Sequence, residues 1–238
     1  MPGPELKAGA RKLMADNAPK LFVISAILVL VETVMSELQF RLPGTSDAYT
    51  LFLDKLLAGE QPSLELFYTG LRPVGVALAA LLWLISPVIE AGYMSYCLKV
   101  TRGAKGGYKD ILDGFLFFGK IILISILSWV FILLWSLLLI FPGVIAAYRY
   151  RQAYYILLDD PKKGALQCIM ESKRLMAGNK LDMFLLDLSF LGWVLLDYAV
   201  ILIIPLPFSV PLVSVFLTPY MGLTRAGYYN TLINKLVV

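Results

Sequence analysis

The stretch from Trp135 to Pro161 decides how this chain folds, and it reads WSLLLIFPGVIAAYRYRQAYYILLDDP. It overlaps an apolar run, residues 120–141, which at about 1.5 Å per residue is long enough to cross roughly 30 Å of hydrocarbon. Pro142 and Gly143 then follow. Proline lacks the N–H that would extend a helix, and glycine accepts the backbone angles of a tight turn. The stretch therefore predicts a helical hairpin that turns at Pro142 and Gly143.

The returning limb of this hairpin is expected to be a second helix, from Val144 to Leu158. It would have about 15 residues and a length of roughly 23 Å, which is short for a membrane span. Asp160 before Pro161 is typical of an N-cap followed by a first-turn proline. We therefore expect the limb to end near the lipid headgroups and a further helix to begin there.

The composition indicates a membrane protein. The chain has 238 residues, of which 59% are hydrophobic and only 16% charged, and its mean hydropathy is +0.75. Soluble domains seldom have such values, and a segment that crosses lipid must satisfy its own backbone hydrogen bonds. The sequence thus predicts an all-α, polytopic bundle of transmembrane helices. The residues before Pro19 include no apolar core and no small-residue cleavage site, so we expect no signal peptide.

Several classes of chemistry are disfavoured by what the sequence lacks. It has no histidine, which removes the commonest general base, the serine-histidine triad and the usual zinc sites. Cys97 and Cys168 are far apart and lack CxxC spacing, so we interpret them as buried thiols rather than redox or metal-binding groups. No catalytic residue, metal site or cofactor is therefore expected.

The hydrophobic pattern predicts one integral membrane domain, residues 1–238, with six spans arranged as three hairpins. The spans are expected at about residues 21–40, 73–98, 120–141, 144–158, 181–204 and 208–230. An amphipathic surface helix precedes each hairpin, at about residues 5–18, 108–118 and 161–177. Residues 41–72 form the predicted extracytoplasmic loop, whose apolar part fits a short helix.

Short internal similarities support a repeat of surface helix and hairpin. Residues 11–17, RKLMADN, precede the first span, and residues 173–179, KRLMAGN, precede the fifth. Pro87 and Pro142 are each followed five and six residues later by a small residue and a tyrosine. Ala-Gly-Tyr occurs at residues 91–93 and again at residues 226–228.

The distribution of Lys and Arg predicts the orientation in a plasma membrane. Of the 21 such residues, 18 fall in segments assigned to one side and only Arg41, Lys55 and Arg72 in the other. Because cytoplasmic loops are enriched in Lys and Arg, both termini are expected in the cytoplasm. The alternative has five spans, with residues 120–158 as a single kinked helix. It would place the basic segment 149–180 outside, against this rule.

The predicted spans contain ionisable residues at depths where charge is unfavourable. An unpaired charge there costs at least about 2.5 kcal/mol on insertion scales, so each should face the bundle and meet an opposite charge or a water-filled cavity. The candidate intramembrane charge cluster comprises Glu32, Glu90, Arg149, Arg151, Asp187 and Asp197. The expected pairs are Arg149 with Glu32 or Asp197, and Arg151 with Glu90 or Asp187.

Two interpretations of this cluster stay open. It is either a substrate, ion or proton site between hairpins, or an internal ion-pair network that fixes the packing of the helices, with Arg151 extending to the headgroups. Outside the spans, the pairs Lys162–Lys163 and Lys173–Arg174 are typical cytoplasmic flanks and candidate contacts for anionic lipid headgroups.

Three stretches carry a resemblance to a known family: FPGVIAAYRYRQAYYILLDDP from Phe141, ESKRLMAGNKLDMFLLDLSFLGW ending at Trp193, and the PY and TRAGYY elements between Pro219 and Tyr229. They resemble the bacterial integral membrane proteins grouped as domain of unknown function 975. A fainter similarity is to the membrane portion of some glycerophosphodiester phosphodiesterases. The resemblance implies an integral membrane protein, from a Gram-positive bacterium, and brings no reaction or catalytic residues.

Three classes of function follow from these observations. The first is a non-enzymatic accessory or scaffold module that binds lipid, anionic lipid in particular, or a membrane partner, which could be a second copy of the chain. The second is a small transporter or channel that uses the intramembrane charges. The third, an enzyme acting on lipid headgroups, is disfavoured because no nucleophile–base pair is evident. Nothing in the sequence indicates binding to nucleic acid.

Overall fold

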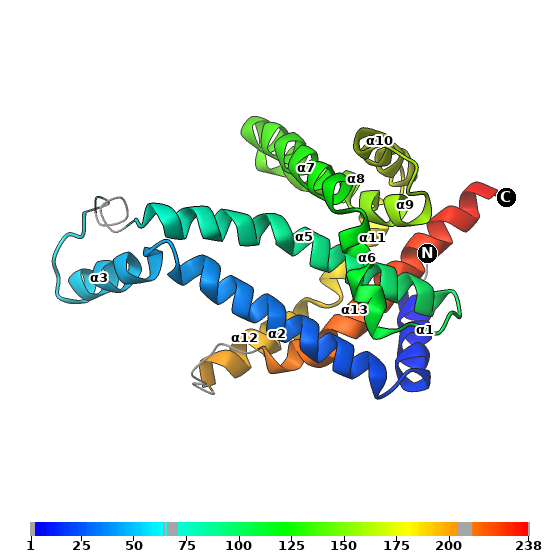
Figure 1. The fold of residues 1–238 in the computed structure, drawn as a ribbon, viewed down its shortest axis with the longest axis horizontal. Helices are drawn as coiled ribbons and strands as arrows, with labels where there is room; N and C mark the ends of the chain where they lie inside the picture. The colour runs from blue at the N-terminus through cyan, green and yellow to red at the C-terminus, as the bar shows by residue number, and fades with distance from the viewer. Residues whose placement is uncertain (1–2, 64, 66–70, 204–210, 238) are drawn as a thin grey trace. The chain divides into compact units, whose positions relative to one another are not determined.

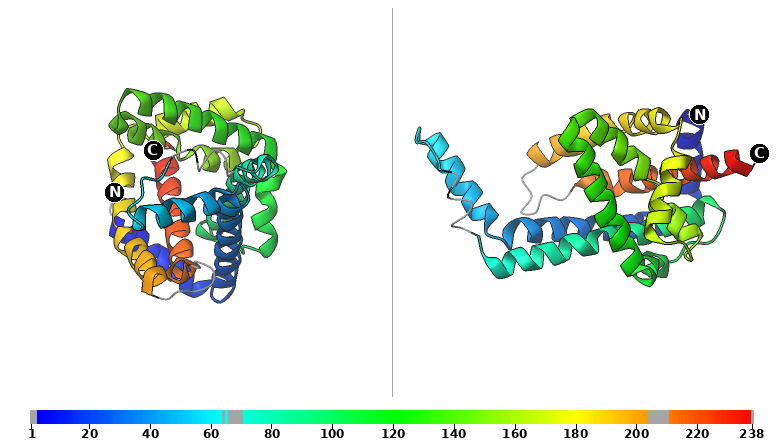
Figure 2. Two further views of the ribbon diagram at one scale, coloured as in Figure 1. Left: turned by 90° about the vertical axis from the view of Figure 1, so that its left-hand side faces the viewer. Right: turned by 90° about the horizontal axis from the view of Figure 1, so that it is seen from above.

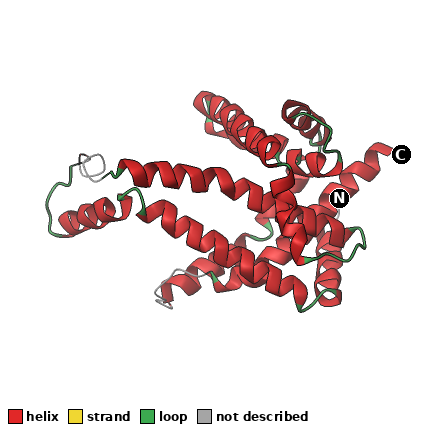
Figure 3. Ribbon diagram, in the orientation of Figure 1, coloured by secondary structure: helices red, strands yellow, loops and turns green. Residues whose placement is uncertain are grey.

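The computed structural model describes residues 3–63, 65, 71–203 and 211–237, and every regular element within these ranges is helical (Figure 3). This confirms the all-α prediction. Among the described residues, four helical segments are long and apolar enough to cross a membrane: Lys20–Arg41, Pro73–Thr101, Phe118–Leu138 and Lys180–Ile203. These segments indicate a membrane-embedded protein. The prediction of six spans is not confirmed.

Figure 1 shows the helices in chain order. They are α1 (Gly3–Asp16), α2 (Lys20–Arg41), α3 (Thr45–Leu57), α5 (Pro73–Thr101), the 3-10 helix η1 (Tyr108–Leu112), α6 (Asp113–Leu116), α7 (Phe118–Leu138), α8 (Ile140–Tyr150), α9 (Ala153–Asp159), α10 (Ala165–Leu175), α11 (Lys180–Leu188), α12 (Leu191–Ile203) and α13 (Leu212–Val237). Helices therefore occupy all three stretches predicted as surface helices. Part of the predicted span 208–230 lies outside the described residues.

The chain divides into two compact units, one of residues 1–29 with 87–238 and one of residues 30–86. In the second unit the predicted loop contains a helix, α3. It begins after Gly44, whose backbone lies in the left-handed region (φ 83°). Arg72 ties the end of the loop to its start, because its N–H donates to Pro43 O (2.9 Å) and its guanidinium pairs with Asp47 (2.8 Å). A Cβ on Gly75 would overlap the carbonyl oxygen of Leu42, so only glycine fits there.

The hairpin of α7 and α8 turns earlier than Pro142 and Gly143. Leu139 breaks the helix with an extended backbone (φ −165°, ψ 152°), and Pro142 lies in the first turn of α8. The N–H groups of a first turn have no intrahelical partner, so proline is tolerated there. Gly143 has no positive φ; instead, a Cβ there would overlap Oγ of Ser136. Glycine at residue 143 thus lets α8 lie directly against α7 (Figure 2).

The returning limb is not the single helix predicted from Val144 to Leu158. It consists of α8 and α9, separated at Arg151 and Gln152. Buried Ser172 of α10 holds this break: its hydroxyl donates to Arg149 O (2.7 Å) and accepts from the N–H of Gln152 (3.1 Å). A side chain from another helix therefore replaces backbone hydrogen bonds that a continuous helix would make itself.

The repeated sequence forms the same local structure twice. The side-chain amide of Asn17 donates to Leu13 O (2.9 Å) after α1, and that of Asn179 donates to Leu175 O (3.2 Å) after α10. In each case the preceding methionine, Met14 or Met176, is buried. The similarity between residues 11–17 and 173–179 thus corresponds to one helix-to-helix turn used at two places.

The helices in the three stretches predicted as surface helices each pack on another helix of the first unit. α1 packs on α13, where Gly227 lies against Leu6. α6 lies on α5, where a Cβ on Gly114 would overlap Val88 O, and α10 packs on α8 and α9 through Ser172. α6 and α10 therefore contact helices that precede them in the chain, whereas α1 contacts the last described helix.

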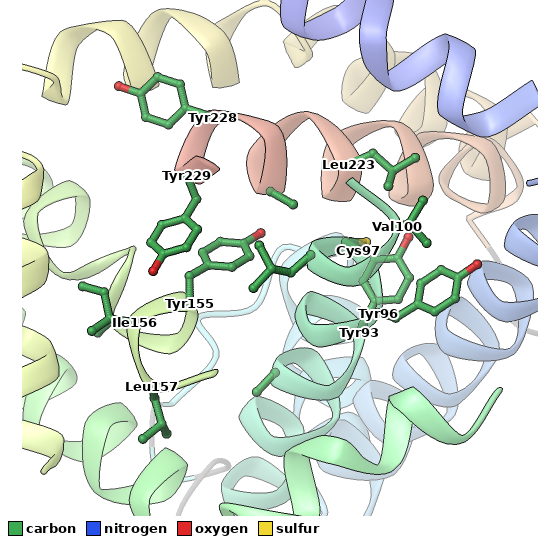
Figure 4. Close-up of a cluster of buried hydrophobic side chains, with 14 of the residues drawn as sticks. Tyr93, Tyr96, Cys97, Val100, Tyr155, Ile156, Leu157, Leu223, Tyr228 and Tyr229 are labelled. Atoms are coloured by element: carbon green, nitrogen blue, oxygen red, sulfur yellow. The ribbon is translucent and has the colours of Figure 1, made fainter. Parts of the chain in front are cut away.

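The core of the first unit includes buried side chains from α5, α9 and α13 (Figure 4). Tyr155 of α9 stacks on Tyr229 of α13, with ring centroids 5.0 Å apart, and Tyr93 of α5 stacks on Tyr96 at 6.3 Å. Both cysteines are free and buried, as expected from the sequence. Stacked tyrosines and aliphatic side chains thus share this core.

Candidate functional site

Three side chains from three parts of the fold converge on one carboxylate, that of Asp187 in α11. Arg151, at the break between α8 and α9, pairs with Asp187 through Nη1 and Oδ2 (2.5 Å), and Arg225 of α13 pairs through Nη2 and Oδ1 (3.1 Å). The hydroxyl of Tyr148 in α8 donates to Oδ2 (3.2 Å). We call Tyr148, Arg151, Asp187 and Arg225 the Asp187 cluster.

The Asp187 cluster is partly enclosed and carries net positive charge. The side chains of Asp187, Arg225 and Arg151 are 16%, 28% and 31% exposed. Two guanidinium groups share one carboxylate, so one positive charge is left over. The guanidinium of Arg151 also lies 5.5 Å from the ring centroid of Tyr148, a distance at which the ring face attracts a cation. The cluster can therefore tie three helices together or attract an anion.

Arg151 meets one of its two expected partners, whereas Glu90 is exposed on α5. Asp187, and not Glu90, is therefore the partner that Arg151 takes.

The expected pair of Arg149 with Asp197 is not formed. The guanidinium of Arg149 lies over the ring of Trp135, 5.7 Å from its centroid. Asp197 is buried and accepts hydrogen bonds from the N–H of Val213 (2.9 Å) and the hydroxyl of Ser214, both in the first turn of α13. It thus caps α13 from α12, because the N–H groups that begin a helix need acceptors and attract negative charge. Glu32 belongs to the other compact unit, and its pairing with Arg149 stays a prediction.

The sequence-based cluster did not include two members of the Asp187 cluster, Tyr148 and the charged residue Arg225. It lies in the TRAGYY element of a largely apolar helix, so the argument applied to Arg149 and Arg151 applied to it equally. Its depth in the helix was a sufficient signal to include it.

A second network joins the ends of α5, α9 and α13. Arg102 holds Asp159 with two hydrogen bonds (2.6 and 2.9 Å), and the hydroxyl of Tyr229 donates to the same carboxylate (2.8 Å). The hydrogen bond to Asp159 raises the pKa of Arg102 above its ordinary value. Asn230 accepts from Arg102 (3.1 Å) and donates to Thr101 (3.0 Å). Arg102 and Asp159 are paired with each other in this network, and we interpret it as an interaction that holds α5, α9 and α13 together.

The candidate headgroup contacts lie on and beside α10. Lys162, Lys173 and Arg174 are exposed. Lys163 pairs with Glu171 (2.6 Å), and this hydrogen bond raises the pKa of the lysine. Three of the four cationic side chains are therefore exposed and available to bind a headgroup. Within the described part of the chain, no group of three or more Cys, Asp or Glu residues could hold a metal ion.

Residues 137–235 match the family described as "Protein of unknown function (DUF975)". The resemblance inferred from the sequence is confirmed over this stretch, which runs from the end of α7 through most of α13 and contains the whole Asp187 cluster. No curated protein and no solved structure matches the chain, and the fainter similarity to phosphodiesterases is not shown.

Proposed function

We propose that this chain is a non-enzymatic membrane module. Its residues 137–235 match a family of unknown function. In this proposal the intramembrane charges hold its helices in place, and its basic surface helices bind lipid or a membrane partner. Catalysis forms no part of it.

The observation that carries the proposal is the closure of the Asp187 cluster. Three donors from α8, its junction with α9, and α13 are already directed at one carboxylate of α11. A carboxylate used in this way fixes how the helices pack, as buried ion pairs do when they specify one arrangement. This favours the structural interpretation of the charges over a transport path.

The binding part of the proposal is supported by α10. Lys173 and Arg174 are exposed on it and Lys162 just before it, whereas Ala165, Cys168 and Ile169 are buried. A helix with one buried face and exposed cations suits a membrane surface, where each cation near anionic lipid contributes about 1 kcal/mol.

We also propose that α8–α9 and α13 lie in the membrane, which would give three hairpins with both termini in the cytoplasm of a bacterial cell. Two contacts support this. α8 lies directly against the candidate span α7 at Gly143, and α13 joins the candidate span α11–α12 through Arg225 and Asp187. The excess of Lys and Arg on one side supports the orientation in the plasma membrane.

The test is native mass spectrometry of the protein taken directly from its own membrane into lipid nanodiscs. Retained anionic lipid, or a protein partner in fixed stoichiometry, is the expected result. A bare monomer without lipid or partner would contradict the proposal.

A second function, transport of a small anion, is favoured by one observation: the Asp187 cluster has two guanidinium groups for one carboxylate. It predicts chloride or phosphate flux from proteoliposomes, lost in Arg225→Gln. The accessory proposal predicts no flux above that of empty liposomes. Flux that persists in Arg225→Gln would remove the cluster from any transport path.

A further inference from the structure

A pocket of about 470 Å³ lies between α1, α11 and α13, away from the Asp187 cluster. Its lining combines charged, hydroxyl and apolar side chains, among them Lys7, Arg11, Asp182, Leu185, Leu186 and Tyr220. No residue from the sequence-based candidate sites lines it.

Two cations from α1 face this pocket. Lys7 is held in place, because its Nζ donates to the carbonyl oxygen of Ser189 (3.3 Å) and lies 4.3 Å from the ring centroid of Phe190. Arg11 follows one helical turn later and is exposed. Burial, and then the nearby charge of Arg11, lower the pKa of Lys7, so an anion placed between the two cations would relieve their repulsion.

The other walls of the pocket are suited to a lipid. Leu185 is 51% exposed, so the pocket opens beside the apolar outer surface of α11. Leu186 and Tyr220 are buried and form its inner wall. A molecule that joins an anionic group to hydrocarbon can therefore place each part in matching surroundings.

The position of α1 fixes the level of the pocket in the membrane. Ala10 and Met14 are buried on one face of α1, whereas Glu5, Arg11 and Lys12 are exposed on the others. An amphipathic helix of this kind lies in the headgroup layer. The pocket that it lines is thus at the level of the phosphates.

We propose that this pocket binds the headgroup of one anionic glycerophospholipid from the surrounding bilayer. Its phosphodiester lies between Lys7 and Arg11, its headgroup hydroxyls face Asp182, and an acyl chain leaves past Leu185. Two cations and one carboxylate leave a single positive charge, which one phosphodiester neutralises. The site deepens the proposed function and rests on it, since it names the lipid class and the place where it binds.

The test uses nanodiscs of phosphatidylcholine with phosphatidylglycerol, and native mass spectrometry counts the lipids retained after detergent exchange. The variant is Lys7→Gln/Arg11→Gln. The matched control is Lys105→Gln/Lys109→Gln, which removes the same charge at two exposed lysines that belong to no candidate site. Arg11→Gln alone, at an exposed side chain, keeps the test valid if the double variant does not fold.

We expect the wild-type protein and the control to retain one phosphatidylglycerol that the α1 variant holds at least about tenfold more weakly. If both variants lose phosphatidylglycerol equally, the lipid is held by general attraction to surface cations and the site is overturned. If the α1 variant retains as much phosphatidylglycerol as the wild type, the site is overturned as well. In either case the proposed lipid-binding function survives. A wild-type protein that retains no anionic lipid would overturn both.

Discussion

A single carboxylate, that of Asp187, accepts hydrogen bonds from Tyr148, Arg151 and Arg225. Removing its charge leaves two guanidinium groups with no carboxylate partner in a partly enclosed place. Breaking a fully buried pair costs about 3–5 kcal/mol, and the partial exposure of these side chains lowers that figure.

We therefore expect Asp187→Asn to lower the free energy of unfolding by about 2 kcal/mol. Thermal unfolding in detergent measures it, with Glu90→Gln, a change at an exposed carboxylate, as the control. Adding Arg225→Gln to Asp187→Asn should recover part of the loss, because one of the two cations is then gone. Equal midpoints for Asp187→Asn and the wild type would show that the cluster does not hold the helices.

Asp110 offers a test by pH. Burial by itself would raise its pKa, but the N–H of Gly107 (2.5 Å) and the ammonium of Lys99 (2.7 Å) outweigh burial and lower it below its ordinary value of 3.8. A carboxyl group with a lowered pKa stabilises the folded state above its unfolded pKa, and this stability is lost as the pH falls through the folded pKa.

Asp110→Asn should thus unfold at a lower temperature than the wild type at pH 7, and the difference should shrink below about pH 4. Unfolding midpoints of both proteins between pH 3 and pH 7 measure this. A difference that does not change with pH would mean that the charge of Asp110 is not what matters.

At the scale of single residues, the sequence predicted which charges need partners but not which partners they find. Depth along a helix follows from residue number, whereas the direction in which a side chain points depends on how the helix is rotated in the bundle. Arg151 therefore had two equally good candidates. Asp197 was assigned to Arg149 because the sequence did not show that the start of α13 would need its carboxylate.

Among the elements, the hairpin of α7 and α8 depends on close approach at Gly143. Adding a methyl group there would press against the Oγ and Cβ of Ser136. A Cβ on Gly119, by contrast, meets nothing within 4 Å. Alanine substitutions at these two glycines therefore distinguish the effect of packing on stability from the effect of helix propensity.

Gly143→Ala should lower the free energy of unfolding by about 1 kcal/mol, within the range for overpacking. Gly119→Ala should raise it slightly, because alanine favours helix more than glycine does. Thermal unfolding measures both changes, and adding Ser136→Gly to Gly143→Ala should restore space and part of the stability. If the two alanine variants behave alike, the helices are not in the close contact described.

The existence and approximate extent of most helices could be predicted from the hydrophobic pattern, but the positions of the breaks could not. Pro142 and Gly143 are compatible both with a turn and with the first turn of a helix, and only packing against Ser136 decides between them. The break at Gln152 depends on Ser172, which lies 20 residues away in sequence. No local pattern signals a hydrogen bond of that kind.

For the whole molecule, the two native cysteines make the orientation easy to test, since both are buried. Arg11→Cys and Lys162→Cys introduce thiols at exposed positions of α1 and of the segment before α10. We expect a membrane-impermeant maleimide to label both in inverted vesicles and neither in intact cells. The wild-type protein should stay unlabelled in both preparations. Labelling of only one variant in intact cells would contradict the prediction that α1 and the segment before α10 lie on the same side of the membrane.

The class of the protein followed from composition, and the internal repeat followed from two seven-residue segments that share four residues in register. The number of spans did not follow, because the charge rule assigns sides to loops without showing whether the helices between them are continuous. The described part of the chain contains four long apolar helical segments, whereas six spans were predicted for the whole.

The packing of α1 on α13 bears on the order in which the first unit can be assembled. α1 precedes every other described helix in the sequence, whereas α13 follows them all. The surface on which α1 docks therefore does not exist until α13 has been synthesised. The two helices that close the first unit are thus the two that lie farthest apart in the sequence.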